Sequence, residues 1–500
     1  MTWYKVLSNS SLPWFRIGLT AIFIASVALR FWGLGRFNNL VFDEVYYGIF
    51  ANNYLIGKEF FNAHPPLSQY IIAIGMWIGS HLPIGQDTVN GLTGSLRSTW
   101  SYRWLNALTG SFIPLVVAAI AYQLNRRRSY ALIAALFAAA DGLFLVESRY
   151  ALNNVYLVIL GLLGQLFFLI ALGQPQKRRW GTLALAGIFF GASACIKWNG
   201  LWFLLGVYMV WGTAWLLQWQ ASRIKGSESD SLSSPNPIHA SNLSRFSKKL
   251  YHKPLLNLTQ LNIFQILLNF ALIPALTYSL LWIPHLRMNP TPGFWQAQHD
   301  ILAFHEKIGS GDKVHPYCAK WYTWLLMIRP IAYFYQTAQT TREQVPAYPP
   351  LPSNAVRVIY DVHAMGNPIL YWLSTATILL LLLLLIHRLW LGVWITFAPT
   401  TTNYITLYLV MNWLANLLPW VKVTRCTFLY HYMGSSVFAG LGLAWIVDRW
   451  LHRKKPRWRN AGIIAIALVV AAFIFWLPIY LGLPLSPQGY KLRMWFPSWI

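Results

Sequence analysis

Two adjacent carboxylates, Asp43 and Glu44, stand in the stretch VFDEVYYGIF, about nine residues after a long apolar segment. The 500-residue chain has only 14 acidic residues, so a neighbouring pair is unusual in it. One carboxylate of such a pair can act as a general base that takes a proton from a hydroxyl group, while its neighbour orients it or raises its basicity. The simpler interpretation is a solvated pair in a loop, which spacing alone favours.

Isolated basic residues stand at the ends of apolar segments: Arg103, Arg149, Lys197 and Arg425. Side chains of this kind either extend to lipid headgroups or bind an anionic group such as a phosphate. His64 precedes two prolines in FFNAHPPLSQY. By itself this pattern indicates a rigid turn with an interfacial histidine, and a binding role is the alternative.

The histidines and cysteines show no metal-site pattern. Three histidines of one long loop lack the spacing of a zinc site: His299, His305 and His315. The cysteines also have no ligand spacing and make no framework: Cys195, Cys318 and Cys426. We therefore expect no metal, no cofactor and no disulfide scaffold.

The composition indicates which elements position these residues. Hydrophobic residues make up 56% of the chain, and the mean hydropathy is +0.43, which is typical of a polytopic membrane protein. The net charge of +25 resides in short clusters between apolar runs, as the positive-inside rule expects, and this disfavours nucleic acid as a partner. We predict eleven spanning helices: 15–34, 104–123, 130–147, 153–172, 180–197, 200–218, 262–283, 369–387, 403–419, 429–447 and 461–480.

Charge bias also predicts the orientation. If 67–84 is a juxtamembrane helix rather than a span, the main basic clusters all lie on the cytoplasmic side, in a plasma (inner) membrane. The Asp43–Glu44 pair and the isolated cations then lie on the outer face. Three parts follow: an N-terminal catalytic module 1–220 with outer loop 35–103, a flexible cytoplasmic linker 221–260, and a C-terminal module 261–500 with outer loop 285–368.

A series of motifs, in order along nearly the whole chain, resembles the protein O-mannosyltransferase family: FDEVYYG, HPPLSQYIIAIG, YRWLNALTG, SRYALNN, IKWNGL, HPYCAKWYTW, GNPILYW and RCTFLYHY. The resemblance implies an all-α membrane glycosyltransferase of the GT-C class with about eleven transmembrane helices. It also implies mannose on a polyprenyl phosphate as donor. The segment 285–368 is too short for the MIR domain of eukaryotic members, so the chain resembles the bacterial type.

The resemblance assigns roles to individual residues. Asp43 and Glu44 are the expected catalytic residues. A second group is expected to bind the donor phosphate: His64, Arg103, Arg149, Lys197, Lys320 and Arg425. Trp321 and Tyr322 are expected to contact the sugar or the acceptor. Asn154 stands where the family usually has an aspartate after SRY, so no acidic role is expected there.

The resemblance implies a glycosyltransferase that moves mannose to Ser/Thr hydroxyls of proteins. Asp43 is the expected general base, and a single displacement at the anomeric carbon inverts its configuration. Outer cations stabilise the phosphate leaving group, so one carboxylate suffices. Two alternatives stay open: a GT-C transferase acting on a lipid or polysaccharide acceptor, and a transporter of lipid-linked sugar.

Overall fold

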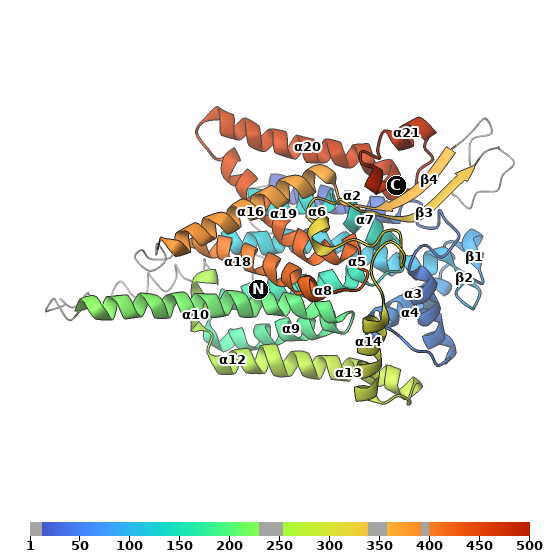
Figure 1. The fold of residues 1–500 in the computed structure, drawn as a ribbon, viewed down its shortest axis with the longest axis horizontal. Coiled ribbons are helices and arrows are strands. Elements are labelled where there is room, and N and C mark those ends of the chain that lie inside the picture. The colour runs from blue at the N-terminus through green and yellow to red at the C-terminus, as the bar shows by residue number, and fades with distance from the viewer. Residues whose placement is uncertain (1–12, 230–253, 339–357, 392–399) are drawn as a thin grey trace.

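The computed structural model describes residues 13–229, 254–338, 358–391 and 400–500. Long helices lie side by side and form a bundle (Figure 1). The bundle helices are α2 (Pro13–Phe31), α5 (Thr99–Asn125), α6 (Arg128–Ala139), α7 (Gly142–Arg149), α8 (Asn154–Leu172), α9 (Gln176–Ala194), α10 (Leu201–Ser229), α12 (Ile263–Leu267), η4 (Leu268–Leu272), α13 (Ile273–Met288), α16 (Pro368–Trp390), α18 (Thr401–Leu417), α19 (Met433–Leu451) and α20 (Pro456–Leu481).

The predicted multi-pass membrane architecture is confirmed. Eight helices in the described part of the chain are long and apolar enough to cross a membrane, or nine if α6 and α7, which meet at 58°, form one bent span. Each of the eleven predicted spans coincides with a helical segment, including the 19-residue helices α9 and α19. The number of crossings itself stays a prediction.

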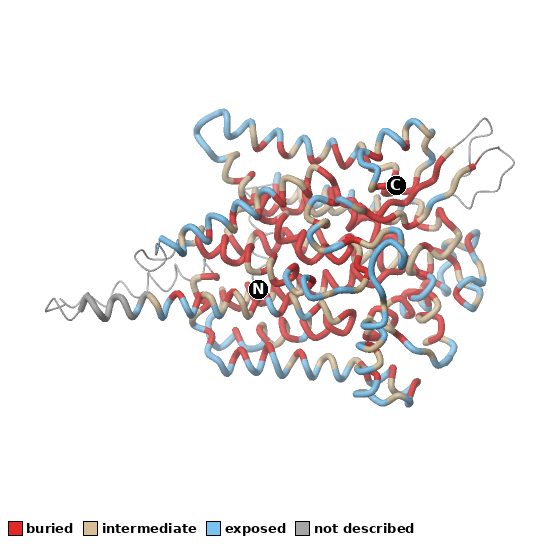
Figure 2. The backbone as a smooth tube through the Cα atoms, viewed as in Figure 1, coloured by how far each residue is buried: buried red, intermediate tan, exposed pale blue. Residues whose placement is uncertain are grey.

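The bundle has an apolar surface suited to lipid. Its centre is buried, while exposed residues follow the outer sides of the peripheral helices (Figure 2). On α13 and the preceding turn most exposed residues are apolar, with Leu272, Leu276 and Leu280 each at least half exposed. Such a face is stable in hydrocarbon and would be unfavourable in water.

Shorter elements gather at one end of the bundle, which we call the loop-bearing end (Figure 1). They include α3 (Glu44–Ile56), α4 (Leu67–Ser80), α14 (Phe294–Lys307), α15 (Trp321–Trp324) and α21 (Pro487–Lys491), with the turns η1 (Gln86–Thr88), η2 (Trp198–Gly200), η5 (Leu418–Lys422), η6 (Leu429–Tyr432) and η7 (Pro497–Trp499). The 3₁₀ helix η3 (Pro254–Gln260) precedes α12. The 14-residue α4 is shorter than a typical span of about 20 residues.

Two antiparallel hairpins also lie at the loop-bearing end, and the prediction of an all-α chain did not include them. The strands β1 (Val89–Asn90) and β2 (Arg97–Ser98) are short. The larger hairpin pairs β3 (Ile331–Ala338) with β4 (Val358–Ala364), with a bulge between Ala332 and Phe334. Its position places Tyr333 against the bundle, where it contributes to the site described below.

The predicted linker 221–260 is described only at its ends. Helix α10 continues to Ser229, and η3 begins at Pro254. The remainder, 230–253, lies outside the described residues, so the predicted division of the chain into modules stays a prediction.

Candidate active site

The two neighbouring carboxylates enter different surroundings. Glu44 is the first residue of α3, and Asp43 precedes it. Phe42, just before them, has a φ of 53°, a left-handed conformation that is unfavourable for a bulky side chain. Its ring stacks on Tyr333, with the centroids 4.2 Å apart, which holds this turn in place. The sharp turn therefore separates the environments of Asp43 and Glu44.

Glu44 is fully buried, and protein groups occupy its carboxylate. It forms a two-point ion pair with Arg103, with distances of 2.9 Å from Nε to Oε1 and 2.7 Å from Nη2 to Oε2. The same oxygens accept hydrogen bonds from the backbone amides of Val41 (2.8 Å) and Ala151 (2.7 Å). A carboxylate held by four donors is poorly suited to receive a substrate proton. Its geometry therefore supports a positioning role instead of the predicted catalytic one.

The two arginines predicted to bind phosphate lie inside the protein. The Arg103 guanidinium also donates to the carbonyls of the loop after α2: Leu34, Phe37 and Asn39. Arg149 donates to carbonyls at the end of α2: Leu29, Arg30, Trp32 and Gly33. Both side chains are almost fully buried. Protein carbonyls therefore occupy both guanidinium groups: those of a loop for Arg103, and those at the end of α2 for Arg149. This placement favours a structural role for both arginines, and their binding of phosphate stays a prediction.

Asp43, in contrast, keeps a free carboxylate. The residue is half-buried, and its carboxylate accepts no hydrogen bond from the residues that the structure describes. Burial raises the pKa of Asp43 to about 6, and the nearby positive charge of Lys197 opposes that rise. A free carboxylate with a pKa close to neutrality has the properties of a general base.

Lys197 lies at the centre of a polar network. Its Nζ donates to Asn154 Oδ1 at 2.9 Å, and Asn154 Nδ2 donates to Glu147 Oε2 at 3.1 Å. Tyr333 donates its hydroxyl proton to the other oxygen of Glu147. Burial lowers the pKa of the Lys197 ammonium, while the charges of Asp43 and Glu147 oppose that effect. The network thus holds one cation beside Asp43.

Sequence reasoning missed the roles of two members of this network. It gives no role to Tyr333, which lies on strand β3 of the unpredicted hairpin. Asn154, at the position that is usually an aspartate in the family, joins Lys197 to Glu147 through the oxygen and the nitrogen of its side-chain amide. Since these residues come from distant segments, no local pattern signals the contacts.

A cavity of about 180 Å³ brings together three of the residues predicted to bind the donor: His64, Lys197 and Arg425. The tryptophans Trp202 and Trp420 also line it. Burial, followed by the charge of Lys197, lowers the pKa of His64 well below its ordinary value, so that imidazole is neutral at pH 7. The cavity therefore offers two cations and a neutral histidine to an anionic group.

An adjoining cavity of about 580 Å³ contains the remaining predicted residues, Lys320, Trp321 and Tyr322. Arg425 lines both cavities, as does Val423. The structure thus places all the predicted cations except Arg103 and Arg149 in one pair of neighbouring cavities.

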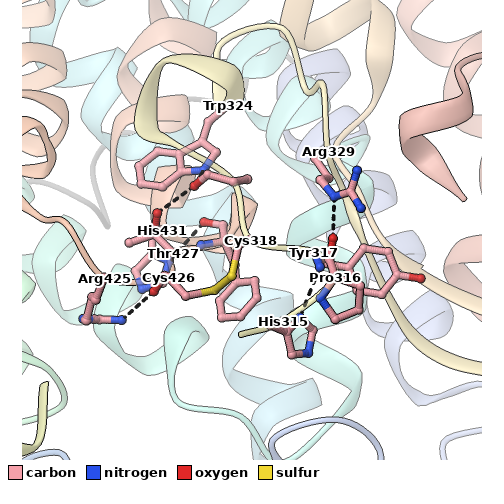
Figure 3. Close-up of a disulfide and its surroundings, with 12 residues drawn as sticks. His315, Pro316, Tyr317, Cys318, Trp324, Arg329, Arg425, Cys426, Thr427 and His431 are labelled. Atoms are coloured by element: carbon pink, nitrogen blue, oxygen red, sulfur yellow. Dashed lines mark hydrogen bonds between the residues drawn. A yellow bond between two sulfur atoms is a disulfide. The ribbon is translucent and has the colours of Figure 1, made fainter. Parts of the chain in front are cut away.

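A disulfide joins two walls of the larger cavity, contrary to the expectation of no disulfide. Cys318 and Cys426 are bonded, with their Cα atoms 5.2 Å apart (Figure 3). Backbone contacts support the junction, because the Ala319 amide donates to the Thr427 carbonyl at 2.7 Å. The two cysteines are separated by 108 positions, so only the fold reveals the pair. The bond fixes Arg425 relative to Lys320, two residues after Cys318.

We expect loss of this disulfide to weaken donor binding. In Cys318→Ser, the segment bearing Lys320 is no longer tied to Arg425, so the donor KM should rise about tenfold while the acceptor KM changes less. Initial rates measured over a range of donor concentrations test this. The control is Cys195→Ala, which removes the buried free cysteine and leaves the disulfide intact. An unchanged donor KM in Cys318→Ser would show that the cavity walls hold their positions without the bond.

The fold and the site define a polytopic membrane glycosyltransferase of the GT-C class. Residues 20–286 match the family described as dolichyl-phosphate-mannose-protein mannosyltransferase, and residues 290–499 match the C-terminal four TMM region of protein-O-mannosyltransferase. The chain belongs to this protein mannosyltransferase family.

Individual relatives extend over almost the whole chain. A polyprenol-phosphate-mannose–protein mannosyltransferase of Mycolicibacterium smegmatis is 24% identical, covering 96% of this chain and 92% of that protein. The enzyme of the same name from Corynebacterium glutamicum is 23% identical, covering 87% of this chain and 81% of that protein. The structure of the S. cerevisiae Pmt1–Pmt2 complex bound to the sugar donor has a TM-score of 0.73 at 13% identity, covering 97% of this chain and 92% of that chain. This last similarity establishes a shared fold.

Proposed function

We propose that the chain transfers mannose from a polyprenyl-phosphate donor to Ser or Thr hydroxyl groups of proteins, with inversion at the anomeric carbon. One observation carries the proposal: in a chain of this family, the free carboxylate of Asp43 interacts with Lys197, and Lys197 lines a cavity together with Arg425. The names of the mycobacterial and corynebacterial relatives support the same donor and the same class of acceptor.

The reaction is a single displacement. The acceptor oxygen attacks the anomeric carbon, and Asp43 accepts the hydroxyl proton as the new C–O bond forms. The bond between that carbon and the phosphate oxygen breaks, and polyprenyl phosphate leaves with the electron pair. Arg425 and Lys320 are the cations best placed to stabilise the leaving phosphate, while Lys197 stabilises the ionised form of Asp43. Glu44 and Arg103 hold the turn that positions Asp43.

The aromatic residues of the larger cavity complete this assignment. Trp321 and Tyr322 line the cavity beside Lys320, and Tyr322 is 52% exposed. Aromatic rings with an exposed face suit the apolar face of a sugar or a peptide side chain. We assign them to binding of the mannosyl group or the acceptor.

The proposed location is the extracytoplasmic side of the plasma membrane. The Cys318–Cys426 disulfide lies at the loop-bearing end, and structural disulfides persist in oxidising compartments. The basic run at 448–459 overlaps the start of α20, and α20 extends from there to the loop-bearing end (Figure 1). By the positive-inside rule, that basic end is cytoplasmic.

The test is transfer of labelled mannose from polyprenyl phosphate by purified protein. The acceptors are a Ser/Thr peptide, a polyprenyl-linked glycan and a polysaccharide, each assayed separately. Labelled peptide with an α-to-β or β-to-α change at the anomeric carbon supports the proposal. Label only in the lipid or polysaccharide would favour the alternative GT-C activity. Donor movement across vesicles without transfer would favour a transporter.

The pH dependence of kcat/KM should follow the ionisation of Asp43. A general base acts only when deprotonated, and burial raises the pKa of Asp43 to about 6. We therefore expect kcat/KM to be constant above that pKa and to fall about tenfold per pH unit below it. Initial rates at subsaturating acceptor measure the profile. In His64→Gln, the fall of kcat/KM at acid pH should keep its midpoint, because His64 is already neutral in that pH range. If the fall disappears in this variant, the titrating group is His64 and not Asp43.

A further inference from the structure

A third cavity, of about 280 Å³, lies beside α14 and has no part in the proposed reaction. We call it the α14 cavity. The segment Glu59–Asn62, the end of α13 with Trp282, and Ala297 and Ile301 of α14 line it. The two helices α13 and α14 meet at the loop-bearing end (Figure 1).

The lining chemistry favours a ligand rich in amide groups over an anionic one. No Lys or Arg is among the described residues that line the α14 cavity, whereas Lys197 and Arg425 line the cavity of about 180 Å³, which we call the catalytic cavity. Asn62 is only 5% exposed, and its Nδ2 has no hydrogen-bond partner within the described parts of the chain. A buried N–H group of this kind is stabilised by an acceptor oxygen such as a peptide carbonyl. The rings of Phe60, Phe61 and Trp282 provide apolar contacts beside it.

The α14 cavity adjoins the catalytic cavity. Ala297, Ile301 and His305 are spaced one turn apart on α14; Ala297 lines only the α14 cavity, His305 only the catalytic cavity, and Ile301 lines both. At a rise of 1.5 Å per residue, Ala297 and His305 lie about 12 Å apart along the helix. An extended peptide covers that distance in about four residues. Asn62 Oδ1 also accepts a hydrogen bond from the backbone amide of His64 at 3.1 Å. Because His64 lines the catalytic cavity, this hydrogen bond connects the walls of the two cavities.

We infer that the α14 cavity binds the acceptor polypeptide about three to five residues away from the Ser or Thr that is modified. Asn62 Nδ2 donates to a backbone carbonyl there, and the rings of Phe60 and Phe61 contact an uncharged side chain. The inference rests on the proposed function, since it names a subsite for the acceptor of that reaction. It predicts that a peptide long enough to reach the α14 cavity binds more tightly than a short peptide that reaches only the catalytic cavity.

The experiment compares two capped peptides with a central threonine, one of three residues and one of nine. For the wild-type protein, the nine-residue peptide should have a KM at least fivefold lower. In Asn62→Asp, Oδ1 still accepts from His64 but the donor is lost, so the KM of the nine-residue peptide should rise about five- to tenfold more than that of the short one. Phe61→Ala, at a side chain already 49% exposed, should act in the same direction without affecting folding. The matched control is Asn460→Asp, an exposed residue on α20 outside the three cavities.

The outcomes separate the two proposals. If the wild-type protein labels neither peptide, the proposed function fails. If it labels both peptides with equal KM, or if both variants raise the two KM values equally, the inference about the α14 cavity is overturned while the function stands. A change confined to the donor KM would also overturn it, because the cavity would then belong to the donor.

Discussion

Asp43→Asn should reduce the single-turnover rate of mannosyl transfer by about 10²–10⁴-fold. The substitution keeps the size of the side chain and removes its ability to accept a proton. Folding should be unaffected, because no described residue donates a hydrogen bond to the Asp43 carboxylate. Donor binding should change little, since the cations proposed to bind phosphate are on other segments. The measurement is single-turnover transfer at saturating donor, with donor affinity determined separately.

Two variants calibrate this result. Asp87→Asn removes an exposed acid of the turn η1 and should leave the rate unchanged. Asp43→Glu keeps a proton acceptor but moves it by one methylene group, so its rate should fall between those of the wild type and Asp43→Asn. A fully active Asp43→Asn protein would remove Asp43 as the general base.

The sequence predicts the helices better than the site because the two depend on different distances along the chain. A span needs about 20 consecutive apolar residues, which is a local property, and the eleven predicted segments all coincide with helices. The Cys318–Cys426 bond and the contact between Tyr333 and Glu147 join residues more than 100 positions apart. Nothing in the local spacing of these residues signals that they meet.

The arginines illustrate a different limit. Isolated cations at the ends of apolar segments suggested phosphate ligands, and the pattern is the same for Arg149 and Arg425. Arg425 lines two cavities, whereas Arg149 satisfies backbone carbonyls at the end of α2. Both arrangements stabilise a cation away from bulk water. The two arginines differ only in the groups that surround the guanidinium, and the tertiary structure determines those groups.

The second large effect concerns stability, because the buried guanidinium of Arg103 depends on Glu44 as its partner. In Glu44→Gln, the buried guanidinium of Arg103 loses its counter-charge, and the new amide group faces backbone donors at Val41 and Ala151. Breaking a buried ion pair by removing one partner costs about 3–5 kcal/mol. We expect a clear fall in the apparent unfolding temperature in detergent. The exposed Glu306→Gln substitution on α14 is the control and should leave that temperature unchanged.

A double variant tests whether the pair, and not one residue, is responsible. Combining Glu44→Gln with Arg103→Met removes both charges, so the double variant should be less destabilised than the sum of the two single variants. Activity should fall in parallel with stability in each single variant, because the Glu44–Arg103 pair holds the turn that carries Asp43. If Glu44→Gln instead unfolds at the wild-type temperature yet loses transfer as completely as Asp43→Asn, Glu44 acts in catalysis directly. Both carboxylates would then take part in the reaction instead of Asp43 alone, and the ion pair with Arg103 would open when substrate binds.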